Sequence, residues 1–226
     1  MSSSMNTDRE GLIEDVLTKE QQEKLTPQAV LAMLKEGNRR FVAGDVTIRN
    51  HRAQIRKAVL HQYPKAIILS CVDSRVPVED VFDRGIGDLF VARVAGNFVN
   101  ADILGSMEFA CNVSGAKLIV VLGHEHCGAI KSAIKNVDMG NITHMLSNLK
   151  PAIAASGDFE GEHSAENPEY VHRVTEQNVI LNIERIRKES PILRQMEDSG
   201  KIMICGALYD MDNGEIVFLP PFDKKG

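Results

Sequence analysis

Residues 117–123 read Lys-Leu-Ile-Val-Val-Leu-Gly, and this stretch is the clearest evidence for the class of fold. It is continuously apolar, rich in β-branched residues and followed by polar residues, which is typical of a strand buried on both faces. Comparable runs lie at residues 66–70, 89–94 and 201–209. Helical patterns separate them, at residues 101–112, 128–136, 142–155 and 168–187. This alternation predicts an α/β fold with a mostly parallel central sheet of about four strands and helices on both faces.

The two ends of the chain complete this prediction. An Asp212-Asn213-Gly214 turn precedes residues 215–219, so that run should return as one antiparallel edge strand. Near the other end, Thr26 and Pro27 predict the start of a helix that continues past Gly37 to residue 42, with another helix at 51–60. Residues 1–25 are predicted to form an N-terminal arm with helical patches at residues 12–17, and residues 26–226 a single domain.

Composition excludes several classes of protein. Of 226 residues, 43% are hydrophobic and 25% charged, which is inconsistent with a mainly disordered chain. The formal net charge of −5 argues against nucleic acid or an anionic membrane as the main partner. No apolar run approaches the roughly 18 residues of a spanning helix, and no secretory signal is visible. We therefore expect a cytoplasmic protein with reduced cysteines.

Candidate metal ligands follow two of the predicted strands. Cys71-Val72-Asp73-Ser74-Arg75 comes directly after residues 66–70, and His124-Glu125-His126-Cys127 directly after residues 117–123. Ligands of open α/β sheets bind beyond the carboxyl ends of the strands. If the two strands are neighbours, Cys71 and Asp73 converge with His124 and Cys127.

These side chains suit one Zn²⁺ per chain. Two thiolates and one imidazole with an open fourth position are typical of a catalytic zinc site, whereas structural sites are usually closed by four Cys or His ligands. Water or the Asp73 carboxylate could take the fourth position. Arg75 is spaced to pair with Asp73 and hold it off the metal, which allows an open state and a closed resting state.

Three other residues are alternatives to these ligands. His126 also precedes Cys127 and is the internal rival of His124; it could serve as a proton relay at the mouth of the site, but an exposed loop histidine more often has no role. Cys111 and Cys205 fit buried packing positions, so we assign them no chemistry. A single Cys-x-Asp-x-Arg or His-x-x-Cys pattern is weak evidence; the pair of motifs at two strand ends is much stronger.

With these motifs the sequence resembles the β-class carbonic anhydrases. The resemblance is carried by residues 71–77, Cys-Val-Asp-Ser-Arg-Val-Pro, and residues 123–129, Gly-His-Glu-His-Cys-Gly-Ala. Residues 89–97 and 34–41 support it, and it extends from about Thr26 to Leu219. The resemblance implies reversible hydration of CO₂ to bicarbonate and a proton by zinc-bound hydroxide.

The same resemblance implies roles for particular residues. Cys71, His124 and Cys127 would be the zinc ligands, and Asp73 and Arg75 the catalytic pair. Gln62 resembles a glutamine that hydrogen-bonds substrate in one branch of the family, a branch whose resting zinc holds water. Phe90 and Phe109 fall where that branch places aromatic residues around the CO₂ pocket. Phe109 is a departure, because the family often has tyrosine there.

Physical reasoning adds to these expectations. The backbone N–H groups at Gly128, which opens a predicted helix, favour an anion such as bicarbonate. CO₂ is small and apolar, so a pocket walled by Phe90, Phe109 and Val94 suits it. Two thiolates cancel the charge of the metal, so activity should rise toward alkaline pH. The resemblance also implies a homodimer or homotetramer whose site lies at the subunit interface, with the N-terminal segment packed on the neighbouring subunit.

Three other functions remain open on the sequence alone. A similar scaffold could hydrolyse a CO₂ analogue such as carbonyl sulfide or carbon disulfide. It could also serve as a zinc-dependent or bicarbonate-sensing binding protein, although the presence of Asp73, Arg75 and Gln62 speaks against this. A thiol-redox role would require a Cys71–Cys127 disulfide, and the chain has no Cys-x-x-Cys motif.

Overall fold

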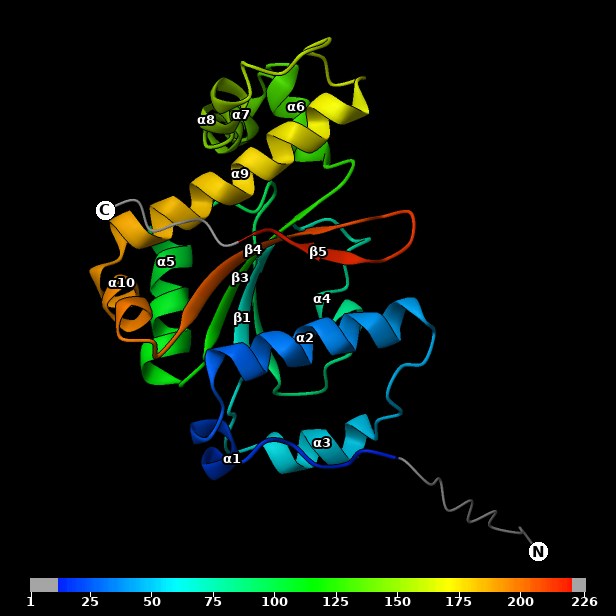
Figure 1. Cartoon of the computed structure of the whole chain (residues 1–226), viewed down its shortest axis with the longest axis vertical. Helices are drawn as coiled ribbons and strands as arrows, with labels where there is room; N and C mark the ends of the chain where they lie inside the picture. The colour runs from blue at the N-terminus through cyan, green and yellow to red at the C-terminus, as the bar shows by residue number, and fades with distance from the viewer. Residues whose placement is uncertain (1–11, 221–226) are drawn as a thin grey trace, which may run out of the picture.

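Five strands form one sheet in the order β2-β1-β3-β4-β5 in a computed structural model that describes residues 12–220 (Figure 1). Parallel pairing joins the first four strands of this order, and β5 pairs antiparallel with β4. The predicted fold class is confirmed, and every predicted strand boundary is correct to within two residues. The strands are β1 (Ala66–Ser70), β2 (Leu89–Arg93), β3 (Leu118–His124), β4 (Met203–Tyr209) and β5 (Ile216–Phe218).

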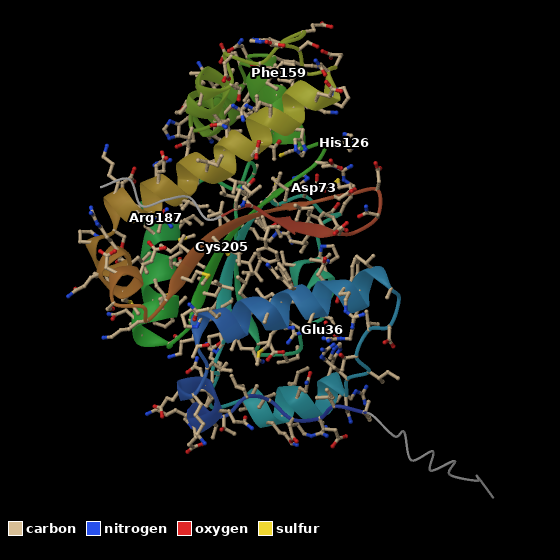
Figure 2. The ribbon with its side chains drawn as sticks, in the orientation of Figure 1. Glu36, Asp73, His126, Phe159, Arg187 and Cys205 are labelled. Carbon is tan, nitrogen blue, oxygen red and sulfur yellow. The ribbon has the colours of Figure 1, made fainter. Side chains whose placement is uncertain are left out.

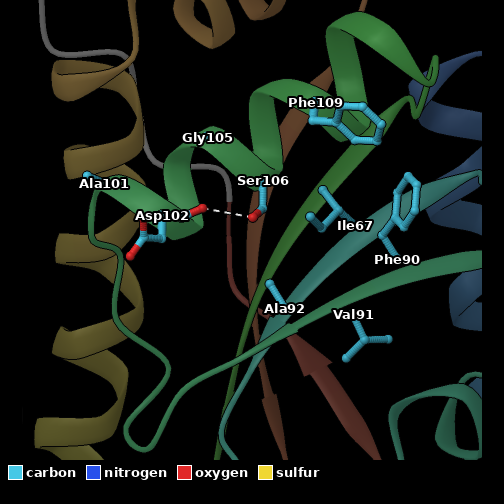
Figure 3. A pocket seen from close by; sticks show the side chains of 9 residues that line it. All are labelled: Ile67, Phe90, Val91, Ala92, Ala101, Asp102, Gly105, Ser106 and Phe109. Atoms are coloured by element: carbon cyan, nitrogen blue, oxygen red, sulfur yellow. Dashed lines mark hydrogen bonds between the residues drawn. The ribbon is translucent and has the colours of Figure 1, made fainter.

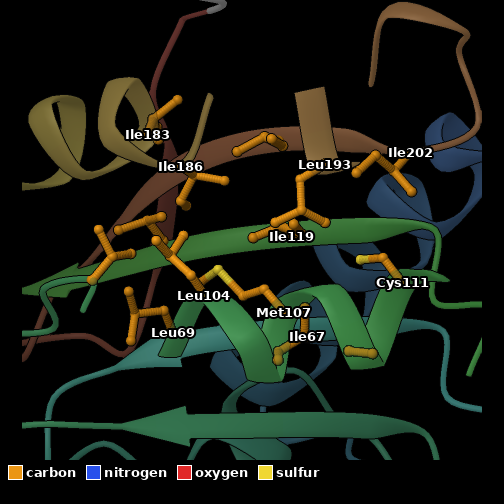
Figure 4. Close-up of a cluster of buried hydrophobic side chains, with 14 of the residues drawn as sticks. Ile67, Leu69, Leu104, Met107, Cys111, Ile119, Ile183, Ile186, Leu193 and Ile202 are labelled. Atoms are coloured by element: carbon orange, nitrogen blue, oxygen red, sulfur yellow. The ribbon is translucent and has the colours of Figure 1, made fainter. Parts of the chain in front are cut away.

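Helices cover both faces of this sheet, as predicted (Figure 1). One face packs against α5 (Ala101–Glu108), α9 (Pro168–Glu189) and α10 (Pro191–Asp198), and the other against α2 (Pro27–Val42) and α4 (Val78–Val81). Alternate side chains of each strand enter opposite cores, so both faces of β1 and β3 are buried. Figure 4 shows the first core, where Ile67 and Ile119 pack with side chains of α5, α9 and α10. No helix among residues 12–220 is long and apolar enough to cross a membrane.

A third group of helices lies beyond the carboxyl ends of the strands. It comprises α6 (Gly128–Ile134), α7 (Gly140–Ser147) and α8 (Lys150–Ala155), which pack around the first turns of α9 (Figure 1). Their buried side chains form one apolar cluster with Cys71 and Cys127. The predicted metal ligands therefore lie against a packed apolar layer.

The structure corrects several helix predictions. The helix predicted at 142–155 is two helices, because Pro151 lacks the N–H that a continuous helix needs, and it lies instead in the first turn of α8. The helix predicted at 101–112 ends in a π-helical turn at Phe109–Val113. The short helices α1 (Lys19–Glu23) and α4 and the eight-residue α10 were not predicted, although Ser190 caps α10 and Pro191 begins it, a recognisable start signal.

The helical patches predicted at residues 12–17 are wrong. This segment is not helical, and Ile13 forms a parallel bridge with Arg49, just before α3 (His51–Ala58). The Gln22 side chain then donates to the carbonyl oxygens of Pro64 and Ser114, so the described part of the arm is attached to its own chain. The first residues of the predicted arm lie outside the described range.

Gly37 shows why α2 continues where a glycine could have ended it. A Cβ at this position would lie 1.9 Å from the carbonyl oxygen of Phe82. The glycine therefore permits close packing of α2 on the end of α4, and this contact offsets its low helix propensity.

A buried carboxylate joins α2 to the loop before α3. Asp83 accepts hydrogen bonds from Thr47 Oγ1 and Arg40 Nε, both at 2.6 Å, and from Arg49 Nη1 at 2.5 Å. Its side chain is 1% exposed. Burial raises the pKa of Asp83, but the hydrogen bonds from Arg49, Thr47 and Arg40 outweigh this effect and lower the pKa to about 2.

We expect Asp83→Asn to reduce the free energy of unfolding by about 2–4 kcal/mol, because it removes the buried carboxylate that pairs with Arg40 and Arg49, and Arg40 keeps only a 3.5 Å contact with the more exposed Glu36. Asparagine tolerates the positive φ of this residue, so the variant changes the charge and not the backbone. The folded pKa lies below the ordinary value near 4. The Asp83 carboxylate therefore makes its full contribution to the free energy of unfolding above about pH 4, and this contribution is lost as the pH falls through about 2. Urea unfolding should show a smaller difference between the two proteins at pH 3 than at pH 7; an equal difference would contradict the assignment.

Candidate metal centre

The sheet places its switch point between β1 and β3. The chain passes from β1 to β2 on one side and then crosses to β3 on the other side of β1. Cys71 directly follows β1, and His124 is the last residue of β3. The two predicted motifs therefore do lie on neighbouring strands, at the place where open α/β sheets bind ligands.

The structure brings together the three predicted ligands. The sulfur atoms of Cys71 and Cys127 and a ring nitrogen of His124 all lie within 4.8 Å of one another. The three residues are 4%, 0% and 1% exposed. His126 lies outside the cluster: it is exposed, and its positive φ of +52° turns the loop between His124 and Cys127. Figure 2 labels His126 and Asp73 at this end of the sheet.

The imidazole of His124 has one ring nitrogen free for a metal. Its Nδ1 lies 2.8 Å from the carbonyl oxygen of Glu125, an acceptor, so Nδ1 carries the proton and Nε2 offers a lone pair. Nε2 is buried and has no hydrogen-bond partner within residues 12–220. Buried polar atoms are rarely left unsatisfied. An orphaned nitrogen beside two sulfur atoms fits a Zn²⁺ ligand set.

The thiols of Cys71 and Cys127 are joined by a hydrogen bond. A hydrogen bond from the Cys127 thiol lowers the pKa of Cys71 well below its usual value. The same contact, together with burial, raises the pKa of Cys127. Burial raises the pKa of both Cys111 and Cys205 to about 12, and neither belongs to the cluster. Of the four cysteines, Cys71 at the predicted site is the one whose pKa is lowered.

The predicted catalytic pair lies beside this cluster. Arg75 donates from Nε to Asp73 Oδ1 at 2.9 Å and from Nη2 to Oδ2 at 2.8 Å, and its backbone N–H also reaches Oδ1. These hydrogen bonds lower the pKa of Asp73 to about 2. Oδ2 lies 3.9 Å from His124 Nε2. The carboxylate is therefore ionised at neutral pH and adjacent to the ligands while both its oxygens remain on Arg75.

Arg93 is a residue of the site that sequence reasoning missed. It ends β2 and donates from Nε to the carbonyl oxygen of Cys71 at 2.8 Å and from Nη2 to that of Asp73 at 2.6 Å. The guanidinium thus fixes the loop that carries one predicted ligand, Cys71, and the predicted catalytic carboxylate of Asp73. The sequence feature that could have identified it is a charged residue at the end of an otherwise apolar strand, next to the metal-centre loop.

The remaining predicted site residues divide into two groups: Val94 and Gly128 lie at the cluster, whereas Gln62, Phe90 and Phe109 of the same chain lie away from it. Gln62 is exposed and precedes the amino end of β1, whereas Cys71 follows its carboxyl end. Val94 packs with the apolar cluster that contains Cys71 and Cys127. Gly128 begins α6, and a Cβ placed on it would meet no atom within 4 Å, so space is open beside it.

Phe90 and Phe109 lie together at a different place. Their ring centroids are 6.3 Å apart, and both line a cavity of about 640 Å³ along the edge strand β2 and helix α5 (Figure 3). Phe90 pairs with Ile67, four residues before Cys71, which corresponds to about 13 Å along the strand. This cavity is therefore separate from the cysteine cluster of the same chain.

Known proteins resemble this chain over most of its length. The sequence model of the family described as carbonic anhydrase matches residues 66–216. Carbonic anhydrase 2 of Mycobacterium tuberculosis is 34% identical over 200 residues, covering 84% of this chain and 92% of that protein. The carbonic anhydrase of Mycolicibacterium smegmatis is 31% identical over 204 residues, with the same coverage of each chain.

Structural similarity agrees with the sequence similarity. The Coccomyxa β-carbonic anhydrase, solved in complex with acetazolamide, superposes with a TM-score of 0.66 at 25% identity. The match covers 84% of this chain and 86% of that one. From these matches, in sequence and in three dimensions, it follows that this chain is an enzyme of the β-class carbonic anhydrase family.

Proposed function

We propose that the chain catalyses the reversible hydration of CO₂ to bicarbonate and a proton, with one Zn²⁺ held by Cys71, His124 and Cys127. The observation that carries this proposal is the convergence of three buried donor atoms, one of them an imidazole nitrogen with no hydrogen-bond partner in the described part of the chain. Three protein ligands leave a fourth position for reaction, as in catalytic zinc sites. When bound, Zn²⁺ acidifies a water molecule so that hydroxide is available to attack CO₂ near neutral pH.

Asp73 and Arg75 orient this reaction in our proposal. The ionised Asp73 can accept a hydrogen bond from the attacking oxygen but cannot donate one, so it selects the orientation in which a lone pair of that oxygen faces CO₂. Arg75 holds the carboxylate in place through two parallel hydrogen bonds. With both oxygens on Arg75, the arrangement supports the open state rather than the closed state in which Asp73 would ligate the metal.

The space beside Gly128 suits the anionic product. Its N–H belongs to the first turn of α6, where the helix dipole favours negative charge. Val94 supplies apolar surface on the same side.

The four cysteines are all free thiols, which supports the cytosol as the proposed compartment.

We propose further that a second copy of the chain completes the site with its Gln62, Phe90 and Phe109. All three are remote from the cysteine cluster of their own chain, and Phe109 is 52% exposed despite being a large apolar side chain. Phe90 and Phe109 line a cavity along β2, the edge strand of the sheet, which pairs with a strand of residues 12–220 on one side only. A homodimer, or a homotetramer built from such dimers, would bury this surface and place CO₂ between apolar walls.

Mixed dimers test this sharing directly. Gln62→Ala should lower kcat/KM about 10²-fold if the amide donates to a developing oxygen. In a dimer of one Gln62→Ala chain and one Cys127→Ser chain, purified through two different tags, one site has intact ligands and the intact Gln62 of the other chain. We expect about half of wild-type activity. A mixed dimer no more active than Gln62→Ala alone, or a monomeric wild type, would contradict the shared site.

The proposed reaction is tested by stopped-flow CO₂ hydration with a pH indicator at pH 7 and pH 8.5, with zinc content measured in the same preparation. We expect about one zinc per chain and faster turnover at pH 8.5. Zinc bound without turnover at either pH would overturn the proposal, and carbonyl sulfide would then be the next substrate tested.

A further inference from the structure

A buried loop between β2 and α5 carries a hydrogen-bond donor to the Cys71 sulfur. The backbone N–H of Gly96 points at Cys71 Sγ at 3.3 Å. Gly96 has a φ of +85°, and a Cβ there would lie 2.8 Å from Leu149 Cδ1, so only glycine fits this turn without displacement. The next residue, Asn97, also has a positive φ, of +38°. Two consecutive residues in this conformation require support from their surroundings.

That support comes from two asparagines of α9, more than 80 residues away in the sequence. Asn178 Nδ2 donates to the carbonyl oxygen of Gly96 at 2.9 Å. Asn182 Oδ1 accepts from the N–H of Val99 at 2.7 Å. Asn182 Nδ2 donates to Asn178 Oδ1 at 3.0 Å, which fixes the orientation of the Asn178 amide. The two side chains thus hold both ends of the turn that presents the Gly96 N–H.

The position of these amides is unusual for their residue type. Asn178 and Asn182 are 1% and 2% exposed, and they lie one helical turn apart on a face that otherwise buries Val174, Val179 and Ile183. Burying an amide is unfavourable unless its hydrogen bonds are satisfied. Here the satisfied partners are backbone groups of the loop at the metal centre, and an apolar pair would pack α9 equally well without holding that loop.

We propose that Asn178 and Asn182 are positioning residues of the metal centre, which hold the Gly96 N–H on the Cys71 sulfur and so set the affinity of the ligand cluster for zinc. This inference rests on the proposed zinc site. A fixed N–H donor disperses charge on the thiolate and keeps its sulfur in the place where His124 and Cys127 meet it. Outer partners of this kind typically change metal affinity 10–100-fold when they are removed.

The test compares three proteins by competition with a chromophoric zinc chelator. Asn178→Leu keeps the side-chain size and removes the donor to Gly96. Thr175→Val is the matched control, because Thr175 is equally buried on the same helix and its hydroxyl donates to the carbonyl oxygen of Val171 within α9 instead of to the metal-centre loop. We expect a zinc dissociation constant 10–100-fold higher for Asn178→Leu and within about threefold of wild type for Thr175→Val.

A spectroscopic measurement separates positioning from general destabilisation. In Co²⁺-substituted protein, loss of the N–H donor raises the energy of the sulfur lone pairs, so the sulfur-to-cobalt charge-transfer band of Asn178→Leu should move to longer wavelength. The band of Thr175→Val should not move. Asn178→Ser, which is too short to reach Gly96, serves if Asn178→Leu does not fold, with the same expectation.

The outcomes distinguish this inference from the function on which it rests. Wild-type protein that fails to bind zinc would overturn the metal centre itself. Wild-type protein that binds zinc, with affinity and charge-transfer band unchanged in the folded Asn178 variant, would overturn the positioning role alone.

Discussion

Cys127→Ser should release zinc and lower kcat/KM for CO₂ hydration at least about 10³-fold, because without the metal nothing acidifies the attacking water. A serine hydroxyl stays protonated near neutral pH and is a poor zinc ligand, and the remaining Cys71 and His124 form an incomplete set. Cys127 is fully buried at the start of α6. The measurement is stopped-flow hydration together with zinc content after dialysis against a chelator.

Cys111→Ser is the matched control for this prediction. It also places a hydroxyl at a buried cysteine, in the core between the sheet and α5, but outside the ligand cluster. This variant should lose some stability while keeping about one zinc per chain and near-normal turnover. Full zinc content and full activity in Cys127→Ser would show that the ligand assignment is wrong.

Asp73→Asn should retain zinc and lose activity about 10²–10⁴-fold, the range typical of a group that handles a proton in the reaction. The variant keeps the shape of the side chain but introduces an N–H₂ donor, so the amide no longer enforces one orientation of the attacking oxygen. It also breaks the charge pairing with Arg75. Because Arg75 is 56% exposed, this should cost little stability.

The pH profile and a surface control complete this test. The pKa of Asp73 is about 2, so the carboxylate stays ionised from pH 5 to pH 9 and its titration should not enter the wild-type profile in that range. Asp158→Asn, at a side chain that is 76% exposed, should leave kcat/KM unchanged. Zinc-loaded Asp73→Asn with wild-type turnover would exclude the orienting role.

Local sequence was sufficient to predict the strands and to propose the ligands, whose donor atoms the structure places within 4.8 Å of one another. The run at residues 117–123 is buried on both faces of the sheet, so its apolar character identifies it without any knowledge of its neighbours. Ligand chemistry is equally local: a thiolate or an imidazole can be recognised by residue type and by its position at a strand end. Helix boundaries were harder, as the two helices around Pro151 and the π-helical turn at Phe109 show, because packing selects among similar local patterns.

Choosing between His124 and His126 as a ligand used both the local sequence and the tertiary structure. Both residues precede Cys127, and residue type cannot separate them. Placement directly after the strand favoured His124, and the structure puts its ring with the two sulfur atoms while the left-handed backbone of His126 leaves that side chain exposed.

The sequence by itself therefore determined the α/β class, the strand order along the chain and the residue types at the metal centre, because hydrophobic periodicity and ligand chemistry are properties of short segments. Only the tertiary structure decided which groups act on those residues from a distance. Arg93 holds the Cys71–Asp73 loop, and the Asn178 amide reaches Gly96 from a helix 82 residues away. The tertiary structure also places Gln62 and Phe90 away from the metal-centre residues of their own chain. Such contacts form only when strands and helices pack, because they join residues that are far apart in the sequence, and no pattern within one short segment indicates them.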